Sequence, residues 1–572
     1  MSSSSMRAYG KVDEAEQVRL EARRRTRKRI TIISLSSIFL VAIVVAAVVG
    51  THAAASNGDS KKGGGEQSLS TSVKAVCDVT LYKDSCYNSL APAAATNQLQ
   101  PEQLFKLSMQ VALNEISKAT QHLSKDGSFG GVKDKKTIKA LQDCQDLLDL
   151  AIDHVNTSLA AAADVSLVDI VDDLRSWLST AGTCHQTCID GLQDTKLKDV
   201  VQGHLKSSSQ LTSNSLAILT WIYKVASSVK LRRLMSYSTD HHKVPKWLHQ
   251  KDRKLLQSSD LKKKADIVVA KDGSGKYKTI GAALKAVPDK SKKRIIIYVK
   301  RGTYLENVRV EKSKWNVMMI GDGMNATIVS ASLNVVDGTP TFSSATFAVF
   351  GKGFIARDMG FQNTAGAIKH QAVALMSNAD QSVFHRCSIS AFQDTLYAHA
   401  NRQFYRECNI YGTVDFIFGN SAVVIQNCNI LPRQPMLGQQ NTITAQGKVD
   451  PNQNTGIVIQ NCTIWPYGNL TGVKTYLGRP WKNYSTTVFM NSMMGSFIDP
   501  TGWLPWTGNT APPTIFYAEF QNFGPGSSTK NRVKWKGLRT ITQKQASQFT
   551  VKEFLHGDKW ISDSGASYNP GL

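Results

Sequence analysis

The 572-residue sequence is short of acidic side chains. It contains 44 Asp and Glu against 68 Lys and Arg, so its formal net charge is +24. The basic excess is not confined to a tail, because residues 257–572 alone carry 35 basic and 19 acidic side chains. If this charge has a dedicated partner, that partner is acidic: nucleic acid, an anionic membrane or an acidic polysaccharide.

Cofactor motifs are also missing. The segment Asp272-Gly-Ser-Gly-Lys276 resembles part of a phosphate loop, but Ala270 stands where the first Gly is needed and Tyr277 follows the Lys. The pair Cys184-His185-x-x-Cys188 has poor spacing for zinc. We therefore expect neither a metal nor another cofactor.

Charge is absent from one long apolar run, Ile30–Gly50, which is long enough to cross a bilayer as a helix. The basic stretch Arg23–Arg29 precedes it, so residues 1–29 are expected to be a cytoplasmic tail and the rest to be luminal. Ala53–Ala55 offers a cleavage site, so a signal-anchor and a cleaved signal both remain open. Either way, the sequence predicts entry into the secretory pathway.

The expected luminal location agrees with two further features. Nine cysteines should mostly form pairs in an oxidising compartment. Five Asn-x-Ser/Thr sequons are predicted glycosylation sites: Asn156, Asn325, Asn461, Asn469 and Asn483.

After a flexible linker (51–70), residues 71–230 have helical periodicity, as in the stripe within Leu141–Leu159. We predict an all-α four-helix bundle with short connections. Cys77 and Cys86 are close enough to join an N-terminal hairpin. Cys144 and Cys184 are expected to bridge two helices, which leaves Cys188 free. A basic linker (231–256) follows, and its dibasic motifs are candidate sites for a secretory-pathway processing protease: Arg232-Arg233 and Arg253-Lys254.

Residues 257–572 change to short β runs and contain an internal repeat. Four segments share one template around Cys387, Cys408, Cys428 and Cys462, at spacings of 21, 20 and 34 residues. A short strand recurring at about 20-residue steps indicates a β-solenoid, in which each repeat is one coil. The four cysteines would then form one column, and Cys408–Cys428 is the expected disulfide.

Two carboxylates repeat with this template. Asp394 follows Cys387 by seven residues and Asp415 follows Cys408 by seven, so they should stack about 5 Å apart on neighbouring coils. Two carboxylates at that distance cannot both ionise easily, so their pKa values should separate. This suits acid–base or nucleophilic catalysis. The alternative is a column of Asp residues that only cap turns.

Five segments of this region resemble the signature blocks of plant pectin methylesterases, in the same order: Gly302-Thr-Tyr304-Leu-Glu306-Asn-Val308, Gln371-Ala-Val-Ala-Leu375, Gln393-Asp394-Thr395-Leu396, Asp415-Phe-Ile-Phe-Gly419 and Leu477-Gly-Arg479-Pro-Trp481. The upstream bundle resembles the pectin methylesterase inhibitor domain. The resemblance implies an all-β right-handed parallel β-helix that hydrolyses methyl esters of homogalacturonan, an acidic wall polysaccharide. It also implies an intramolecular inhibitor-like domain and a cell-wall enzyme made from a membrane-anchored precursor.

The resemblance also assigns roles. It makes Asp415 the nucleophile and Asp394 the proton donor to departing methanol. The other expected site residues bind the oxyanion, the nucleophile or the sugar: Gln393 and Gln371, Arg479, and Trp481 with Thr341. Two departures from the family pattern, Met376 for Arg and Ala391-Phe392 for Gly-Tyr, put substrate preference in doubt.

Other functions remain possible from the residues alone. Paired carboxylates on a β-helix also cleave glycosidic bonds, so a polygalacturonan hydrolase or lyase is the nearest enzyme alternative. A non-catalytic wall-binding or inhibitor protein is the alternative from another class. Nucleic acid would match the charge, but the predicted luminal topology argues against it.

Overall fold

The computed structural model describes residues 71–94, 99–125, 134–193, 195–234 and 261–572. All of them belong to one compact unit, Leu69–Leu572. The predicted membrane segment Ile30–Gly50 and the dibasic motif Arg253-Lys254 lie outside the described residues. Within the described ranges, no helix combines the length and the apolar character that a membrane crossing requires.

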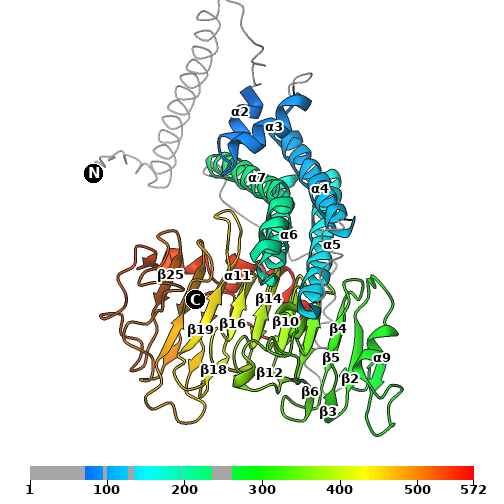
Figure 1. Ribbon diagram of the computed structural model, residues 1–572, viewed down its shortest axis with the longest axis vertical. Helices are drawn as coiled ribbons and strands as arrows, with labels where there is room; N and C mark the ends of the chain where they lie inside the picture. Colours follow the sequence, from blue (N-terminus) through cyan, green and yellow to red (C-terminus); the bar gives the residue numbers. More distant parts are fainter. Residues whose placement is uncertain (1–70, 95–98, 126–133, 194, 235–260) are drawn as a thin grey trace, which may run out of the picture. The chain divides into compact units, whose positions relative to one another are not determined.

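The N-terminal part is helical (Figure 1), which confirms the predicted helical region. Two short helices precede four long ones: α2 (Thr71–Cys77), α3 (Lys83–Ala94), α4 (Pro101–Lys125), α5 (Lys135–Asp164), α6 (Leu167–Gly191) and α7 (Thr195–Leu234). Each long helix packs against two others, α4 and α6 each against α5 and α7. They form a four-helix bundle.

Local sequence explains where α5 begins and which face it buries. Asp134 precedes the helix, and its carboxylate accepts a hydrogen bond from the Thr137 backbone N–H at 2.8 Å, as an N-cap does. The buried side chains follow the helical period along one face, from Ala140 to Ala162. Helix α6 differs, because it also buries a row of Ser and Thr side chains: Ser176, Ser179, Thr180, Thr183 and Thr187.

The disulfides of the bundle correct one prediction. Cys77 is joined to Cys86, which confirms the expected N-terminal hairpin. Cys144, however, is bonded to Cys188, with a Cα–Cα distance of 4.4 Å, while Cys184 is free and buried. The connection between α5 and α6 lies at residues 165–166, so an antiparallel pair places Cys144 opposite residue 187. Periodicity alone could not choose between two cysteines one helical turn apart.

Residues 267–539 wind into three parallel sheets (Figure 1). The first sheet has eleven strands: β1 (Ile267–Val269), β2 (Ile295–Val299), β5 (Val317–Ile320), β8 (Ile355–Arg357), β11 (Ser382–His385), β14 (Arg402–Arg406), β17 (Ala422–Gln426), β20 (Gly456–Gln460), β23 (Thr486–Met490), β25 (Phe516–Phe520) and β26 (Leu538–Arg539). The second has eight: β3 (Gly302–Leu305), β6 (Thr327–Ala331), β9 (Gly360–Asn363), β12 (Ser388–Ser390), β15 (Asn409–Gly412), β18 (Asn429–Pro432), β21 (Thr463–Ile464) and β24 (Met493–Met494).

The third sheet matters most for the site and has seven strands: β4 (Val308–Val310), β7 (Phe347–Val349), β10 (Leu375–Ser377), β13 (Leu396–Ala398), β16 (Ile417–Gly419), β19 (Asn441–Gln446) and β22 (Thr475–Gly478). Short helices lie at the two ends of the region: α9 (Ile280–Lys285), α10 (Gln543–Ser547) and α11 (Val551–Leu555). The result is the predicted parallel β-helix, which we call the solenoid.

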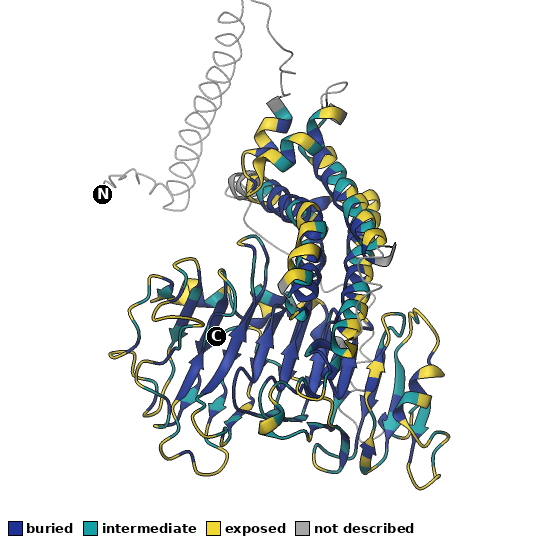
Figure 2. Ribbon diagram, viewed as in Figure 1, coloured by how far each residue is buried: buried dark blue, intermediate teal, exposed yellow. Residues whose placement is uncertain are grey.

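The repeat found in the sequence is one coil of this solenoid. The template strands pair in register, Val383 with Phe404, Phe404 with Val424 and Val424 with Val458. The residue before each template cysteine turns the chain into the next sheet with a left-handed φ of 52–54°: Arg386, Glu407, Asn427 and Asn461. Figure 2 shows that the strands are mostly buried, and the inner core contains solenoid residues only.

The predicted disulfide Cys408–Cys428 is wrong, because both cysteines are free in the structure. The Cys408 backbone N–H points to the Cys428 sulfur at 3.2 Å, and the Cys387 N–H points to the Cys408 sulfur at 3.4 Å. In an in-register parallel stack, equivalent side chains all point in the same direction. The four sulfurs therefore form a column in which neighbours lie above one another without bonding.

Candidate active site

The two repeated carboxylates lie at the same edge of the seven-stranded sheet. Asp394 lies two residues before β13 and Asp415 two residues before β16. Both have left-handed backbone angles, φ 61° and 51°, which Asp tolerates better than most residues. The Asp394 backbone N–H donates to the Val414 carbonyl at 3.1 Å, so the two turns are stacked on adjacent coils.

Asp415 is held as a fully paired anion. Arg479, which follows β22, donates from Nε and Nη2 to the two carboxylate oxygens at 2.8 and 2.7 Å. The Thr442 hydroxyl donates to the same carboxylate at 2.6 Å and accepts from the Asp415 backbone N–H at 2.8 Å. A bidentate guanidinium favours the charged carboxylate and fixes its orientation.

Asp394 has the opposite environment. It is 8% exposed. Burial raises its pKa well above the usual range, the charge of Asp415 raises it further, and Arg479 only partly offsets both. Asp394 therefore keeps its proton at a pH where an ordinary Asp has lost it. Two stacked carboxylates with different environments supply an acid and an anion in one place.

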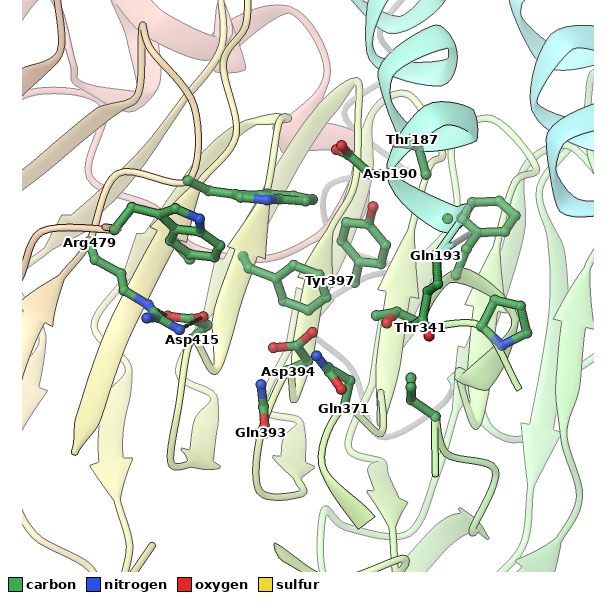
Figure 3. A pocket seen from close by; sticks show the side chains of 18 of the residues that line it. Thr187, Asp190, Gln193, Thr341, Gln371, Gln393, Asp394, Tyr397, Asp415 and Arg479 are labelled. Atoms are coloured by element: carbon green, nitrogen blue, oxygen red, sulfur yellow. Dashed lines mark hydrogen bonds and ion pairs between the residues drawn. The ribbon is translucent and has the colours of Figure 1, made fainter. Parts of the chain in front are cut away.

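Two glutamines complete this edge. Gln371 and Gln393 form a parallel bridge between neighbouring coils, and Figure 3 shows both side chains beside the Asp394 carboxyl group. Their amide N–H groups are neutral donors, the kind that stabilises a developing oxyanion. The sequence prediction had placed both residues at this point.

These side chains line a cavity of about 280 Å³ together with Thr341, Trp481 and several residues that the sequence reasoning missed. Tyr397 stacks on Phe418 with ring centroids 4.1 Å apart, and Trp506 lies 6.4 Å from Trp481. The sequence did contain a pattern that could have predicted Tyr397 and Phe418. Each follows its aspartate by three residues, so the repeat carries an aromatic column beside the acidic one.

The cavity is closed on one side by the bundle. Lys136, Thr187, Asp190, Gly191 and Gln193 line it, and Figure 3 shows Thr187 and Asp190 on the last turns of α6. Asp190 forms an ion pair with Lys482 at 2.7 Å, next to Trp481. The Thr187 hydroxyl lies 2.9 Å from His399. No local motif predicts contacts between residues more than 200 positions apart.

The two departures from the family pattern lie outside this cavity. Met376 is 1% exposed and packs in a cluster that contains both bundle and solenoid residues. Ala391 is buried inside the solenoid core. Phe392 carries the Arg433 guanidinium 4.0 Å above its ring. Only Phe392 is partly accessible, and none of the three lines the site.

The predicted glycosylation sites differ in exposure. Four sequon asparagines are exposed and Asn461 is half-buried: Asn156, Asn325, Asn469 and Asn483 are the exposed ones. Their glycosylation stays a prediction. Across residues 71–572, leaving out the undescribed gaps, no group of three or more His, Cys, Asp or Glu side chains is arranged to hold a metal.

A carboxylate paired with an arginine, beside a carboxyl group that keeps its proton and two amide donors, defines a hydrolase with a carboxylate nucleophile or base. The fold and the order of the site residues specify which one. Residues 266–558 match the Pectinesterase family model, and residues 71–218 match the model for plant invertase/pectin methylesterase inhibitors.

The names of similar proteins agree with these two family matches. A pectinesterase/pectinesterase inhibitor of Arabidopsis thaliana is 57% identical over 99% of both chains. Pectinesterase 3 of Phaseolus vulgaris is 47% identical, again over 99% of both. The structure of a pectin methylesterase from carrot is 53% identical with a TM-score of 0.53, covering 54% of this chain and 98% of that one.

The chain belongs to the pectinesterase family and carries an inhibitor-family domain ahead of the enzyme domain. It is a carboxylic ester hydrolase of pectin. The inhibitor-family match indicates that the bundle is an inhibitory pro-region.

Proposed function

We propose that the cavity hydrolyses the C6 methyl ester of galacturonate residues in homogalacturonan with Asp415 as the nucleophile. A carboxylate oxygen of Asp415 attacks the ester carbonyl carbon and forms a tetrahedral intermediate. Gln393 and Gln371 donate hydrogen bonds to its oxyanion, a contribution of about 3–4 kcal/mol per donor in other esterases. Arg479 orients the Asp415 carboxylate for the attack through its ion pair.

Asp394 supplies the proton for the next step. When the intermediate collapses, the C–O bond to the methoxy group breaks and Asp394 protonates the leaving oxygen, which departs as methanol. Asp394 is then a carboxylate and takes a proton from water, and the hydroxide attacks the acyl-enzyme. Asp415 leaves as a carboxylate and Asp394 is protonated again. The observation that carries this proposal is the raised pKa of Asp394 beside the arginine-paired Asp415.

The direct test is an assay on residues 257–572 with esterified homogalacturonan. We expect methanol and no new reducing ends. New reducing ends would indicate a glycosidic hydrolase or lyase instead, and the absence of both products would indicate a binding protein. Trp481 and Thr341, which line the cavity, are proposed to contact the sugar rings.

The bundle is proposed to inhibit by covering the cleft. The end of α6 lines the cavity, and Asp190 forms an ion pair with Lys482 beside Trp481. A domain on the same chain meets its target at a high effective concentration, of order millimolar for a flexible linker. We expect the full chain to release methanol at least about tenfold more slowly than residues 257–572. Equal rates would contradict the proposal.

Release of the enzyme domain is proposed to follow cutting in the linker 231–256. Arg232 and Arg233 lie in the last turn of α7, whereas Arg253 and Lys254 lie beyond it. Proteases cut exposed, non-helical chain most readily, so the helical position of the first motif makes it the poorer candidate. Alanine at all four positions should retain the full-length protein inside plant cells. Wall-localised protein of mature size from that variant would rule these motifs out.

The cellular route is proposed to be the secretory pathway and then the cell wall, where plant pectinesterases act on their polymer. The apolar run Ile30–Gly50 would hold the precursor in the membrane until cleavage. Immunoblots of microsomal and wall fractions with an antibody to the solenoid test this order. A full-length, alkali-extractable precursor in microsomes would contradict membrane insertion.

A further inference from the structure

A second cavity, of about 430 Å³, lies at the other edge of the seven-stranded sheet. Because the strands are parallel, residues that precede them share one edge and residues that follow them share the opposite edge. Asp394 and Asp415 precede their strands, whereas Lys312 follows β4 and Lys352 follows β7. The two cavities have no lining residue in common.

Three lysines of the solenoid line this second cavity: Lys290, Lys312 and Lys352. Their loops are tied together. The Lys290 backbone N–H donates to the Ser313 carbonyl at 2.6 Å, and Trp315 donates from its indole N–H to the Lys312 carbonyl at 2.9 Å. Trp315 also lines the cavity. The positive groups are therefore held in place by the solenoid itself and do not depend on the bundle.

The solenoid leaves this positive charge unbalanced. Asp380 lines the cavity as well, but Arg402 pairs with both of its oxygens at 2.9 and 2.7 Å. Lys290 and Lys352 make no ion pair with any residue in the described ranges. Like charges in one cavity repel each other, so an anion bound there would lower the energy of the arrangement.

The bundle supplies an anion at this place. Asp153 of α5 forms an ion pair with Lys312, and Asp146, two turns earlier, pairs with Arg309 at 3.1 Å. Lys352 lies over the Trp177 ring of α6, 5.9 Å from its centroid. A bundle carboxylate thus already pairs with Lys312 and an aromatic ring lies against Lys352, so the cavity admits a carboxylate beside its lysines.

We infer that Lys290, Lys312 and Lys352, with Trp315, form a binding subsite for the free carboxylates of de-esterified homogalacturonan, which α5 covers in the two-domain chain. The inference rests on the proposed function, because the polyanion is the product of that reaction. Residues 261–315 carry 16 basic and five acidic side chains, so the surrounding surface attracts a polyanion from a distance. The subsite favours polymer that already carries free carboxylates.

The test compares two triple variants of residues 257–572. This part of the chain has its own core and corresponds in extent to the carrot pectin methylesterase. One carries Lys290→Ala, Lys312→Ala and Lys352→Ala. The other removes equal charge at exposed lysines elsewhere: Lys530→Ala, Lys534→Ala and Lys536→Ala. The probe is a fully de-esterified oligogalacturonate, titrated by calorimetry at two salt concentrations, after thermal unfolding has shown that both variants are folded.

The first variant should bind at least about tenfold more weakly than the parent and should show a flatter salt dependence. The second should stay within about twofold of the parent. Equal losses, or no loss in either variant, would overturn the inference. The full chain should also bind more weakly than residues 257–572, and equal binding would refute the covering by α5. Methanol release by the parent is a separate measurement, so binding through the lysines without esterase activity would refute the function and keep the subsite.

Discussion

The bundle and the solenoid meet through surfaces of opposite charge. Residues 71–234 contain 17 basic and 17 acidic side chains, whereas residues 257–572 have a net charge of +16. At the contact, however, the bundle contributes the carboxylates and the solenoid the cations, in five Lys or Arg pairs among the described residues: Asp146 with Arg309, Asp153 with Lys312, Asp172 with Lys559, Asp173 with Arg402 and Asp190 with Lys482.

The bundle and the solenoid also bring different apolar and polar groups to their contact. The solenoid presents one outward register of the seven-stranded sheet to the bundle: Ala348, Met376, Tyr397, Phe418 and Ala445. Helix α6 contacts this face largely through hydroxyl groups. Thr180 donates to Asn401 at 2.9 Å, and Asn420 donates to Thr183 at 2.9 Å. A contact rich in hydroxyls and ion pairs resembles an interface between separable proteins more than a shared core. This agrees with the proposed removal of the bundle.

The largest expected effect comes from substituting the two proposed catalytic carboxylates, which belong to the solenoid alone. Asp394→Asn and Asp415→Asn should each lower methanol release from residues 257–572 by about 10³-fold or more, because one removes the acid and the other the nucleophile. Combining them should cost little beyond either alone, since they act as one unit. More than a tenth of the parent rate in either folded variant would rule out the assignment.

A positive charge under the bundle should break the docking and leave the solenoid intact. Met376→Arg would place a guanidinium in a buried apolar cluster, at a cost of about 3 kcal/mol to the docked state. In residues 257–572 the same change should be tolerated, because Met376 lies on the outer face there. Full-chain esterase activity should rise toward that of residues 257–572. Met376→Leu is the matched control and should leave the full chain inhibited.

The solenoid was predictable because its order is local and repeated. The seven-residue offset from Cys387 and Cys408 placed Asp394 and Asp415 on adjacent coils, as the structure has them. The same repeat misled the prediction of Cys408–Cys428, since equal position in a coil means equal direction of the side chain. A repeat defines columns, but it does not bring neighbours in a column toward each other.

The contact between bundle and solenoid was not predictable in the same way. Asp190 and Lys482 lie 292 residues apart, and neither belongs to a motif. Periodicity predicts only the apolar faces of α5 and α6. The Ser and Thr face of α6 has the composition of an ordinary solvated surface, so it does not indicate a contact. The choice of Cys188 over Cys184 needed the position of the α5–α6 turn, which the helical period does not give.

One bundle carboxylate at the contact has no cation of its own and gives the smallest predicted effect. Asp143 of α5 accepts a hydrogen bond from Ser343 of the solenoid, but its other oxygen is enclosed without a partner. Burial raises its pKa to about 7, and nearby Asp146 raises it while Arg309 and Lys139 lower it. Between about pH 4 and 7 the folded chain thus keeps a proton that the unfolded chain has lost, so Asp143 should cost more stability as pH rises to 7 and a constant amount above it.

The variant Asp143→Asn removes that cost, so it should stabilise the full chain by about 1–3 kcal/mol at pH 8 and by less at pH 6. Two buried histidines act in the opposite direction, because burial lowers the pKa of His154 to about 4 and that of His399 to about 3. They destabilise the fold as pH falls below about 6.5, but equally in the parent and the variant, so the difference in stability between the two isolates Asp143. Urea unfolding at pH 6, 7 and 8 measures the difference. The exposed Asp149→Asn on the same helix is the control. If the difference in stability between Asp143→Asn and the parent is the same at pH 6 and pH 8, Asp143 is ionised at the contact throughout and the prediction is wrong.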